Sequence, residues 1–405
     1  VEFLRFEGLH FEHTRWVQPG PGVEDLLAPS FRIPGRAQRG RYRGEKASSC
    51  QGAADVPGVV YMAGARGCAV ENCRLAHLGW YGVEMADGCR GNRVVGNEIC
   101  DLGGGGVKVD GAAYDEPPAL RTGGNRITDN HIHRGGRVFH SAIGVLSMHS
   151  FGNSISHNHI HDLYYSGVSC GWVWGYAPSI SRDNHIEYNH IHNLGQGLLS
   201  DMGGIYTLGV QPGTVLRGNL IHDVEKLNYG AWCIYPDEGS SHILIEKNVC
   251  YRTNGEIFHQ HYGRENLVRN NIFAFGGESL TAHGRADLQH KAFNWERNIF
   301  ITDGRPVFKG GYSVRLRDRN LRSDLNLFWD VSGQPLSFVD GQESLDFQGW
   351  QELGHDRHSI VAKPLCSAPR DGDFRVSEDS PAVVELGFEP VNIDCVGPRE
   401  GKERD

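Results

Sequence analysis

The sequence predicts an all-β chain that folds as a single-stranded, right-handed parallel β-helix. Three observations predict it. A short motif, Asn-x-apolar, recurs at spacings of 23 to 33 residues. A second apolar run beside a glycine recurs within the units, as in GVKVDG, SGVSCG and GIYTLG. Apolar residues spaced as in an amphipathic helix are almost absent. Short strands at this period are typical of a stacked solenoid.

The asparagines mark equivalent turns of successive coils. Parallel stacking places equivalent residues about 4.8 Å apart along the axis, so we expect the Asn side chains to hydrogen-bond to one another and to turn backbone as a ladder. Their apolar neighbours are expected to stack inside, and these are Ile99, Ile132, Ile160, Ile191 and Ile221. The asparagines are Asn97, Asn130, Asn158, Asn189, Asn219, Asn248, Asn271, Asn298 and Asn326.

Histidines recur at fixed places after these asparagines. His-x-His repeats can bind zinc or copper. In a strand, however, both rings point to one side while the Ile between them points into the core, and no Cys or carboxylate set completes a four-ligand pattern. We therefore interpret them as a structural ladder of neutral imidazoles and predict no metal site and no cofactor. They are His133, His161, His192 and His222, with His131, His159 and His190.

Composition excludes several classes of function. The chain has 405 residues and a net charge of −9, without a basic run, whereas nucleic-acid binding needs clustered Lys and Arg. No apolar stretch approaches the roughly 18 residues of a membrane helix. None of the ten cysteines lies in a CxxC motif, so buried thiols are the favoured interpretation, and one or two disulfides between coils stay open. We expect a monomer that binds neither nucleic acid nor membrane.

The repeat predicts one continuous β-helix over residues 1–337, followed by a terminal coil and a cap over the open end at residues 338–405. The chain opens at Val1 inside a strand-like run, VEFLRFEGLHFEHT. The β-helix is therefore expected to be incomplete at its N-terminus, with any export signal outside this sequence. A secreted or periplasmic location is expected.

Two aspartates stand out in adjacent coils, Asp201 in SDMGG and Asp237 in PDEGSS. Counting from the preceding or the following motif asparagine predicts that both occupy one strand face, next to Gln260 and His283. Two carboxyl groups one coil apart suit glycosidic cleavage, in which one protonates the leaving oxygen and the other attacks the anomeric carbon or activates water. Such proximity also separates their pKa values. The aspartates expected only to cap turns or join a ladder are Asp101, Asp162 and Asp223.

Side chains that can stack on sugars or hydrogen-bond to them are dense around this pair. Any single aromatic residue is equally well explained by ordinary packing, and the cluster carries the interpretation. It predicts a carbohydrate-active enzyme that binds a polysaccharide or oligosaccharide in an open surface groove. The predicted substrate contacts are Tyr206, Trp172, Trp174, Trp232, Glu238, His259, Gln260, His261, Arg264 and His283.

Three segments resemble the catalytic coils of the β-helical glycoside hydrolases of family 141: SDMGGIYTLGVQPGTV, YPDEGSSHILIEKNVCYRT and FHQHYGRENLVRNNIFAFG. The resemblance runs from about Asn97 to Glu400. It implies an exo-fucosidase or a xylan-cleaving enzyme, with Asp201 and Asp237 at the positions of the two aspartates proposed as catalytic in that family. The chain departs from the family by lacking further N-terminal coils and an inserted domain, which leaves its substrate subsites open.

Two other functions stay open. A polysaccharide lyase needs a basic residue to take a proton and often Ca²⁺ to neutralise a uronate, and Lys108 and Asp110, with His261 and Arg264, could supply such a site. A non-catalytic, carbohydrate-binding β-helix would need no paired carboxylates. Product analysis separates the three functions. Hydrolysis leaves a reducing sugar, a lyase also leaves an ultraviolet-absorbing double bond, and a binding module leaves the polymer intact.

Overall fold

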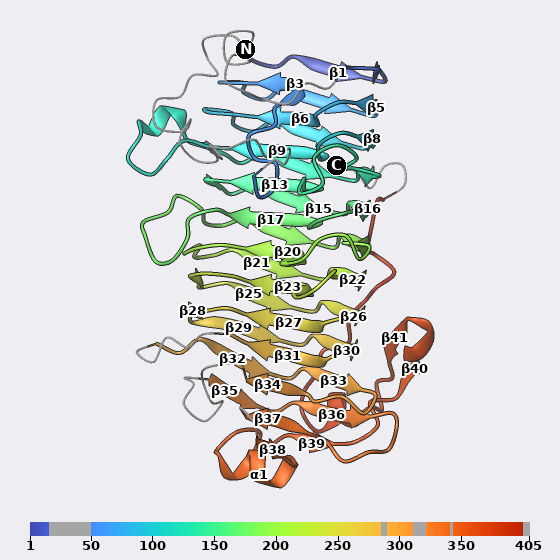
Figure 1. Cartoon of the computed structure of the whole chain (residues 1–405). Helices are drawn as coiled ribbons and strands as arrows, with labels where there is room; N and C mark the ends of the chain where they lie inside the picture. The colour runs from blue at the N-terminus through green and yellow to red at the C-terminus, as the bar shows by residue number, and fades with distance from the viewer. Residues whose placement is uncertain (16–49, 285–289, 311–320, 341–342, 400–405) are drawn as a thin grey trace.

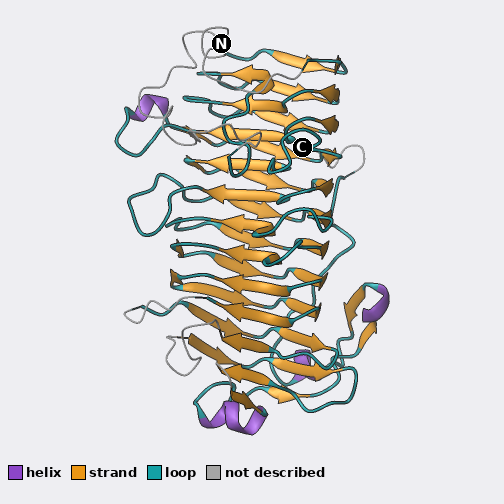
Figure 2. Ribbon diagram, in the orientation of Figure 1, coloured by secondary structure: helices purple, strands orange, loops and turns teal. Residues whose placement is uncertain are grey.

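The computed structural model describes residues 1–15, 50–284, 290–310, 321–340 and 343–399. The described chain winds into a column of stacked coils (Figure 1). Successive coils contribute strands to three long sheets, called here sheets I, II and III, in which neighbouring strands are parallel apart from one terminal pair. Strands dominate the regular structure (Figure 2). The predicted parallel β-helix is confirmed.

Sheet I has 11 strands. In order along the stack they are β1 (Arg5–Glu7), β4 (Ala69–Glu71), β7 (Arg93–Val95), β11 (Arg126–Thr128), β15 (Ser154–Ser156), β18 (His185–Glu187), β21 (Val215–Arg217), β25 (Leu244–Glu246), β29 (Asn266–Arg269), β32 (Phe293–Glu296) and β35 (Leu321–Asp324).

Sheet II has 12 strands and carries the histidines. They are β2 (His10–Glu12), β5 (Arg74–Leu78), β8 (Glu98–Leu102), β12 (His131–His133), β16 (His159–Leu163), β19 (His190–Leu194), β22 (Leu220–Val224), β26 (Val249–Thr253), β30 (Ile272–Gly276), β33 (Ile299–Thr302), β36 (Leu327–Asp330) and β39 (Ile360–Val361).

Sheet III also has 12 strands, and only its last pair, β37 and β38, is antiparallel. They are β3 (Gly58–Met62), β6 (Tyr81–Met85), β9 (Val107–Asp110), β13 (Val145–Met148), β17 (Val168–Gly171), β20 (Met202–Thr207), β23 (Ala231–Pro236), β27 (Glu256–Gln260), β31 (Ser279–His283), β34 (Phe308–Gly310), β37 (Phe338–Asp340) and β38 (Glu343–Leu345).

Short elements complete the fold. Within the described ranges, no helix is both long enough and apolar enough to cross a bilayer. The small pairs are β10 (Thr122–Gly123) with β14 (Ser150–Phe151), β24 (Ser240–Ser241) with β28 (Gly263–Arg264), and β40 (Cys366–Ala368) with β41 (Asp373–Val376). The helices of the described segments are η4 (Pro118–Leu120), α1 (Phe347–Glu352), η6 (Pro369–Asp371) and α2 (Pro381–Val384).

The predicted asparagine ladder occupies the turn between sheets I and II. The Oδ1 of Asn158 accepts hydrogen bonds from the backbone nitrogen of Asn130 at 3.1 Å and from its Nδ2 at 2.9 Å. The Nδ2 of Asn158 in turn donates to the Oδ1 of Asn189 at 2.9 Å. These side chains are fully buried, so each rung supplies the partners that the next rung's turn needs. The ladder is confirmed along its predicted length.

A second asparagine ladder, not predicted from the sequence, precedes the strands of sheet I. The backbone nitrogen and the Nδ2 of Asn125 donate to the Oδ1 of Asn153 at 3.1 Å and 3.3 Å. Asn92 and Asn184 continue the ladder on either side. Each of these residues lies five positions before a motif asparagine, so the same repeat carried the signal. Both turns that flank sheet I are therefore held by buried side-chain amides.

Left-handed residues turn the chain near the ends of the sheet II strands. Asp162 and Asp223 have φ angles of 55° and 54°, a region that Asp tolerates better than most residues. Their carboxylates accept hydrogen bonds from the Nδ1 atoms of His161 at 2.9 Å and His222 at 2.6 Å. Asp101 has the same backbone conformation, with φ of 53°. These contacts match the turn and ladder roles predicted for the three aspartates.

The histidines form two columns of stacked rings on the outer face of sheet II. The ring of His159 lies 4.8 Å from that of His131 and 4.9 Å from that of His190, and it stacks nearly parallel to both. Burial and the neighbouring imidazoles lower the pKa of His131 to about 4 and that of His159 to about 3. The predicted ladder of neutral imidazoles agrees with this arrangement.

One core runs through the coils. Ile132, Ile160 and Ile191 pair in register and are fully buried, as predicted. Toward the C-terminal end the filling becomes aromatic; for example, the rings of Phe273 and Phe300 stack at 5.6 Å. All ten cysteines have free thiols and eight of them are buried, which agrees with their interpretation as small apolar residues.

Helix α1 covers the C-terminal end of the stack (Figure 1). Its Trp350 is fully buried and stacks on Phe308 at 5.2 Å and Phe338 at 5.0 Å. Helix α1 thus lies over the last aromatic rungs of the core. Because two aromatic rungs would otherwise face solvent, this helix removes the exposed end of the core.

The residues after β39 do not cover that end, in contrast to our prediction for residues 338–405. They pack beside sheet II, where Phe374 contacts Tyr251 at a ring separation of 4.9 Å. The chain then returns along the column (Figure 1), and Arg399 forms an ion pair with Asp129 at 2.7 Å. Apolar side chains on the outside of sheet II explain this course, since they offer a second surface to bury. Residues 400–405 lie outside the described ranges.

We expect Asn158→Ala to lower the free energy of unfolding by about 3 kcal/mol or more, because unpaired buried polar groups cost about 1–3 kcal/mol each. The change removes the acceptor of Asn130 and the donor to Asn189. Urea unfolding followed by circular dichroism measures the loss. Asn228, whose side chain is exposed, provides the control: Asn228→Ala should change stability by no more than about 0.5 kcal/mol. Equal losses in the two variants would contradict a ladder that holds the stack.

Candidate active site

Asp201 lies directly before β20, at the start of a sheet III strand. Its φ of 64° is left-handed, and both neighbouring coils hold it there. Its backbone N–H donates to the carbonyl of Tyr229 at 3.2 Å, and its carbonyl accepts from the hydroxyl of Tyr165 at 2.8 Å. Its Oδ1 accepts from the hydroxyl of Tyr235 at 3.1 Å. Asp201 is half-buried. Tyr165 and Tyr229 hold its backbone, and the hydroxyl of Tyr235 orients its carboxyl group.

Asp237 lies directly after β23. It is 6% exposed, and its Oδ2 accepts a hydrogen bond from the hydroxyl of Tyr206 in the preceding coil. Its Oδ1 is paired with the Nδ1 of His261 in the following coil, at 2.8 Å. Because a carboxylate only accepts hydrogen bonds, both contacts favour the ionised form of Asp237.

The register between the two coils differs from the one predicted. Tyr206 pairs with Tyr235, and Met202 pairs with Ala231, so Asp201 precedes one strand while Asp237 follows the other. The register predicted by counting through Gln260 is therefore not the observed one. The turn before β20 pairs with residues 225–230 before β23, but only residues 254–255 separate β26 from β27, so a count that passes through that shorter coil is offset. The long side chain of Tyr235 bridges the offset by reaching back to Asp201.

The two carboxyl groups have pKa values displaced in opposite directions. Burial, reinforced by the negative charge of Asp237, raises the pKa of Asp201. Burial also acts to raise the pKa of Asp237, but hydrogen bonds from His261 and Tyr206 outweigh it, and the pKa of Asp237 is lowered. Asp201 therefore keeps its proton to higher pH than Asp237 does. Opposed pKa values in an interacting pair are the property that separates a general acid from a base or nucleophile.

A small group of side chains orients this pair from behind. Burial and the nearby carboxylates raise the pKa of Tyr206 and of Tyr235 far above the usual range, so both hydroxyls remain donors. The Nε2 of Gln51 donates to the hydroxyls of Tyr206 at 3.2 Å and of Tyr165 at 3.1 Å. Gln51 and Tyr165 were not predicted from the sequence. No repeat position marks Gln51, which lies 155 residues from Tyr206.

Trp232 and His259 form a stacked pair beside Tyr235. Their ring centroids lie 4.3 Å apart, and the Nε1 of Trp232 donates to Glu256 at 2.8 Å. Trp232 is 4% exposed and Tyr206 is 2% exposed. In contrast to our prediction, the rings of Trp232 and Tyr206 have no open face on which a sugar could stack. We infer that these two side chains instead help to position Asp201 and Asp237. His259 is half-buried and remains a candidate contact.

Gln260 and His283 are neighbours in adjacent coils, as the counting predicted. Their side chains are 3% and 1% exposed, and the ring of His283 stacks on Phe308 at 5.8 Å inside the coil. The prediction that they contact substrate is therefore not supported by their placement. The alternation of a strand decides this, because Gln260 points to the opposite face from His259 and His261.

The remaining predicted contacts lie on the turns that follow β17, β23 and β27. Trp172 is 6% exposed, with its Nε1 bonded to Ser169 at 2.9 Å, whereas Trp174 is 47% exposed. Glu238 accepts from Tyr262 at 3.0 Å. The guanidinium of Arg264 lies 3.5 Å from the ring centroid of Tyr176. Of the predicted aromatic contacts, only Trp174 is largely exposed, and it packs edge-on against Trp172 at 5.5 Å.

Sheet II carries groups of side chains whose geometry suits a metal ion. Within the described residues, ligand atoms lie within 4.8 Å of one another in three overlapping groups. These groups are His131 with His159 and His161, His159 with His190 and His192, and Glu98 with His131 and His133. They do not include Asp201 or Asp237. The structural interpretation of the ladder therefore does not by itself exclude metal binding.

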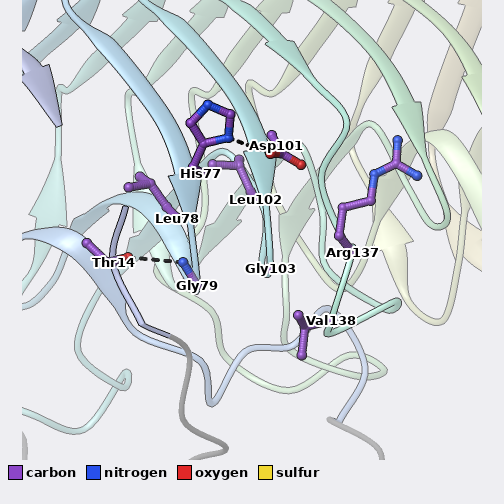
Figure 3. A pocket seen from close by; sticks show the side chains of 9 residues that line it. All are labelled: Thr14, His77, Leu78, Gly79, Asp101, Leu102, Gly103, Arg137 and Val138. Atoms are coloured by element: carbon purple, nitrogen blue, oxygen red, sulfur yellow. Dashed lines mark hydrogen bonds and ion pairs between the residues drawn. The ribbon is translucent and has the colours of Figure 1, made fainter. Parts of the chain in front are cut away.

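A shallow pocket of about 210 Å³ lies near the N-terminal end of the stack (Figure 3). It is formed where β5 and β8 end, and the pair between His77 Nδ1 and Asp101 Oδ2, at 2.6 Å, lies at its rim. None of the predicted site residues lines it. Its lining is mostly apolar, and it has no pair of carboxyl groups, so we place the chemistry at Asp201 and Asp237 instead.

Residues 58–238 match the protein family described as a right-handed beta helix region. This match agrees with the three parallel sheets of the structure. The fold is a right-handed parallel β-helix. A comparison with curated protein sequences finds no match.

Solved structures with this fold include carbohydrate-active enzymes. One is described as a glycoside hydrolase, at 25% identity and a TM-score of 0.51; the match covers 67% of this chain and 48% of that one. Another is an alginate lyase of polysaccharide lyase family 6, at 14% identity and a TM-score of 0.51, covering 86% of this chain and 52% of that one. The chain thus spans about half the length of each. The lyase likeness shows the fold alone, and membership of family 141 stays a prediction.

We expect carbon-detected NMR titration to give Asp201 a higher pKa than Asp237, because burial and the Asp237 charge act on Asp201. Asp237→Asn removes that charge and should lower the pKa of Asp201. Asp183→Asn, a change at an exposed aspartate, should leave it unchanged. An Asp201 pKa that is the same in the wild type and in Asp237→Asn would contradict electrostatic coupling of the pair.

Proposed function

We propose that the chain is a glycoside hydrolase that cleaves a plant or host polysaccharide by two-carboxylate chemistry. One observation carries the proposal: Asp201 and Asp237 interact electrostatically, yet their surroundings displace their pKa values in opposite directions. Glycosidic cleavage needs one carboxyl group that holds a proton and one that has lost it. The likeness to a structure described as a glycoside hydrolase supports the same reaction class.

The surroundings of the pair support a different role for each aspartate. Asp201, with its raised pKa, is the general acid that protonates the leaving oxygen. Asp237, held ionised by Tyr206 and His261, attacks the anomeric carbon or activates water. Tyr235 donates to Asp201, and this hydrogen bond orients the acid without taking up its proton. Substrate binding falls to the exposed turns beside the pair, where Trp174 and His261 are accessible.

The alternative of a polysaccharide lyase loses one of its candidate bases. Lys108 is 3% exposed and forms an ion pair with Glu84 at 3.1 Å. Its Nζ also donates to the carbonyls of Val56 at 2.6 Å and Ala54 at 3.2 Å. A lysine held in this way has no path to a substrate proton. His261 and Arg264 remain as candidate residues for a lyase, and the likeness to an alginate lyase at 14% identity shows the fold alone.

A screen of plant and host glycans, followed by product identification, tests the proposal. We expect reducing sugars to accumulate without absorbance from a new double bond. Products that carry that double bond would replace the proposal with a lyase. Binding of a glycan without any cleavage would replace it with a binding module.

We expect Asp201→Asn and Asp237→Asn each to lower kcat/KM on the cleaved glycan by about 10²–10⁴-fold, because Asn can neither donate nor accept the proton. The variants should also differ. An aryl glycoside with a good leaving group should restore turnover in Asp201→Asn but not in Asp237→Asn, whereas added azide should restore it only in Asp237→Asn.

The matched control for these variants is Asp183→Asn, which changes an exposed aspartate on the turn before β18. It should keep wild-type kcat/KM. Melting curves of all three variants should overlap with that of the wild type. Wild-type activity in either Asp201→Asn or Asp237→Asn would refute the assigned pair.

We expect a bell-shaped dependence of kcat/KM on pH. Asp237 must be ionised, so activity falls as pH decreases through its lowered pKa; Asp201 must be protonated, so activity falls as pH rises through its raised pKa. Tyr206→Phe removes a donor to Asp237, which raises the pKa of Asp237 and should move only the acid limb to higher pH. A shift of the basic limb alone would show that the roles are reversed.

A further inference from the structure

The histidine columns on sheet II contain short nitrogen–nitrogen contacts in addition to ring stacking. Rings of neighbouring coils stack about one rung apart, but the closest polar contacts run diagonally between the columns. The Nε2 atoms of His131 and His161 lie 2.8 Å apart, as do those of His159 and His192. Two imidazole nitrogens at this distance share one proton between two lone pairs. A metal ion can take the place of such a proton.

A carboxylate determines the tautomer of His161 in the first of these contacts. The Oδ2 of Asp162 lies 2.9 Å from the Nδ1 of His161. Because a carboxylate accepts hydrogen bonds, this Nδ1 carries the proton and the Nε2 of His161 presents a lone pair toward His131. A second-shell carboxylate on the remote ring nitrogen is the usual partner of a metal-binding histidine. The same pairing recurs at His222, whose Nδ1 lies 2.6 Å from Asp223.

A third ring completes a ligand set. One ring nitrogen from each of His131, His159 and His161 lies within 4.8 Å of the other two. Parallel strands hold these rings in register: His131 pairs with His159, and two residues further along the same strands His133 pairs with His161. The three side chains are half-buried, which leaves a path for an ion from solvent.

We propose that His131, His159 and His161 bind a divalent transition-metal ion of the Zn²⁺ type. Three imidazoles with one open position form a known zinc geometry, and imidazole prefers such ions to Ca²⁺ or Mg²⁺. Asp162 acts as a positioning residue through His161. The carboxylate of Glu98, grouped with His131 and His133, adds negative charge beside the site. The ion joins two adjacent coils and lies outside the proposed catalytic pair.

The test is a calorimetric titration of the whole, chelator-treated chain with ZnCl₂. We expect saturable binding and a melting temperature that rises with Zn²⁺ concentration, whereas CaCl₂ should produce neither. Asp162→Asn keeps all three rings and should weaken Zn²⁺ binding by about 10–100-fold. His161→Gln removes a ligand and should weaken it further. Co²⁺ should give the visible absorption bands of tetrahedral nitrogen coordination in the wild type and lose them in His161→Gln.

The matched control is His185→Gln, because His185 is an exposed strand histidine outside the three groups. It should bind Zn²⁺ as tightly as the wild type. Circular dichroism establishes that each variant is folded before titration. The proposal is overturned if the wild type binds no Zn²⁺, or if folded His161→Gln binds it as tightly as the wild type does. Hydrolysis by the chelator-treated chain is measured separately, so failure of this site and failure of the proposed function are distinguishable.

Discussion

In-register stacking of parallel coils is the constraint on which the rest of the structure depends. Each buried Asn of the ladder accepts from one neighbouring rung and donates to the other, as Asn158 does with Asn130 and Asn189. A turn so held cannot shift by one residue without leaving buried amides unpaired. The ladders on both sides of sheet I therefore determine which residues meet across coils in the neighbouring sheets.

The candidate active site uses this regularity and departs from it. Stacking brings Tyr206 beside Tyr235 and places their hydroxyls next to two carboxyl groups. The carboxyl groups themselves lie at opposite ends of the paired strands, so their surroundings differ. Hydrogen bonds from His261 and Tyr206 lower the pKa of Asp237, whereas burial and the nearby negative charge of Asp237 raise the pKa of Asp201. That asymmetry gives two chemically identical side chains different protonation behaviour, which acid–base chemistry requires.

The histidine columns show how one repeat can serve stability and binding together. The rung spacing places imidazoles in ring contact, as with His131 and His159 at 4.8 Å, and the intervening Ile side chains fill the core. The following turn residue, Asp162, then directs the Nε2 lone pair of His161 toward His131. A ladder that is structural by its stacking thus also presents converging lone pairs, because stacking and ligation use different parts of the ring.

The sequence by itself determined the solenoid, the asparagine ladder, the buried isoleucines and the histidine columns, because rung spacing and strand alternation turn a repeat directly into contacts. It also singled out Asp201 and Asp237 as the candidate catalytic pair, because their motifs resemble those of a known family of hydrolases. Only the tertiary structure decided their register, which depends on turn lengths that counting cannot assign. Only the tertiary structure shows that the side chains of Gln260 and His283 are buried and that Gln51 hydrogen-bonds to Tyr206. That last contact joins segments far apart in the chain, and no periodic signal marks a segment that folds over a sheet from outside the repeat.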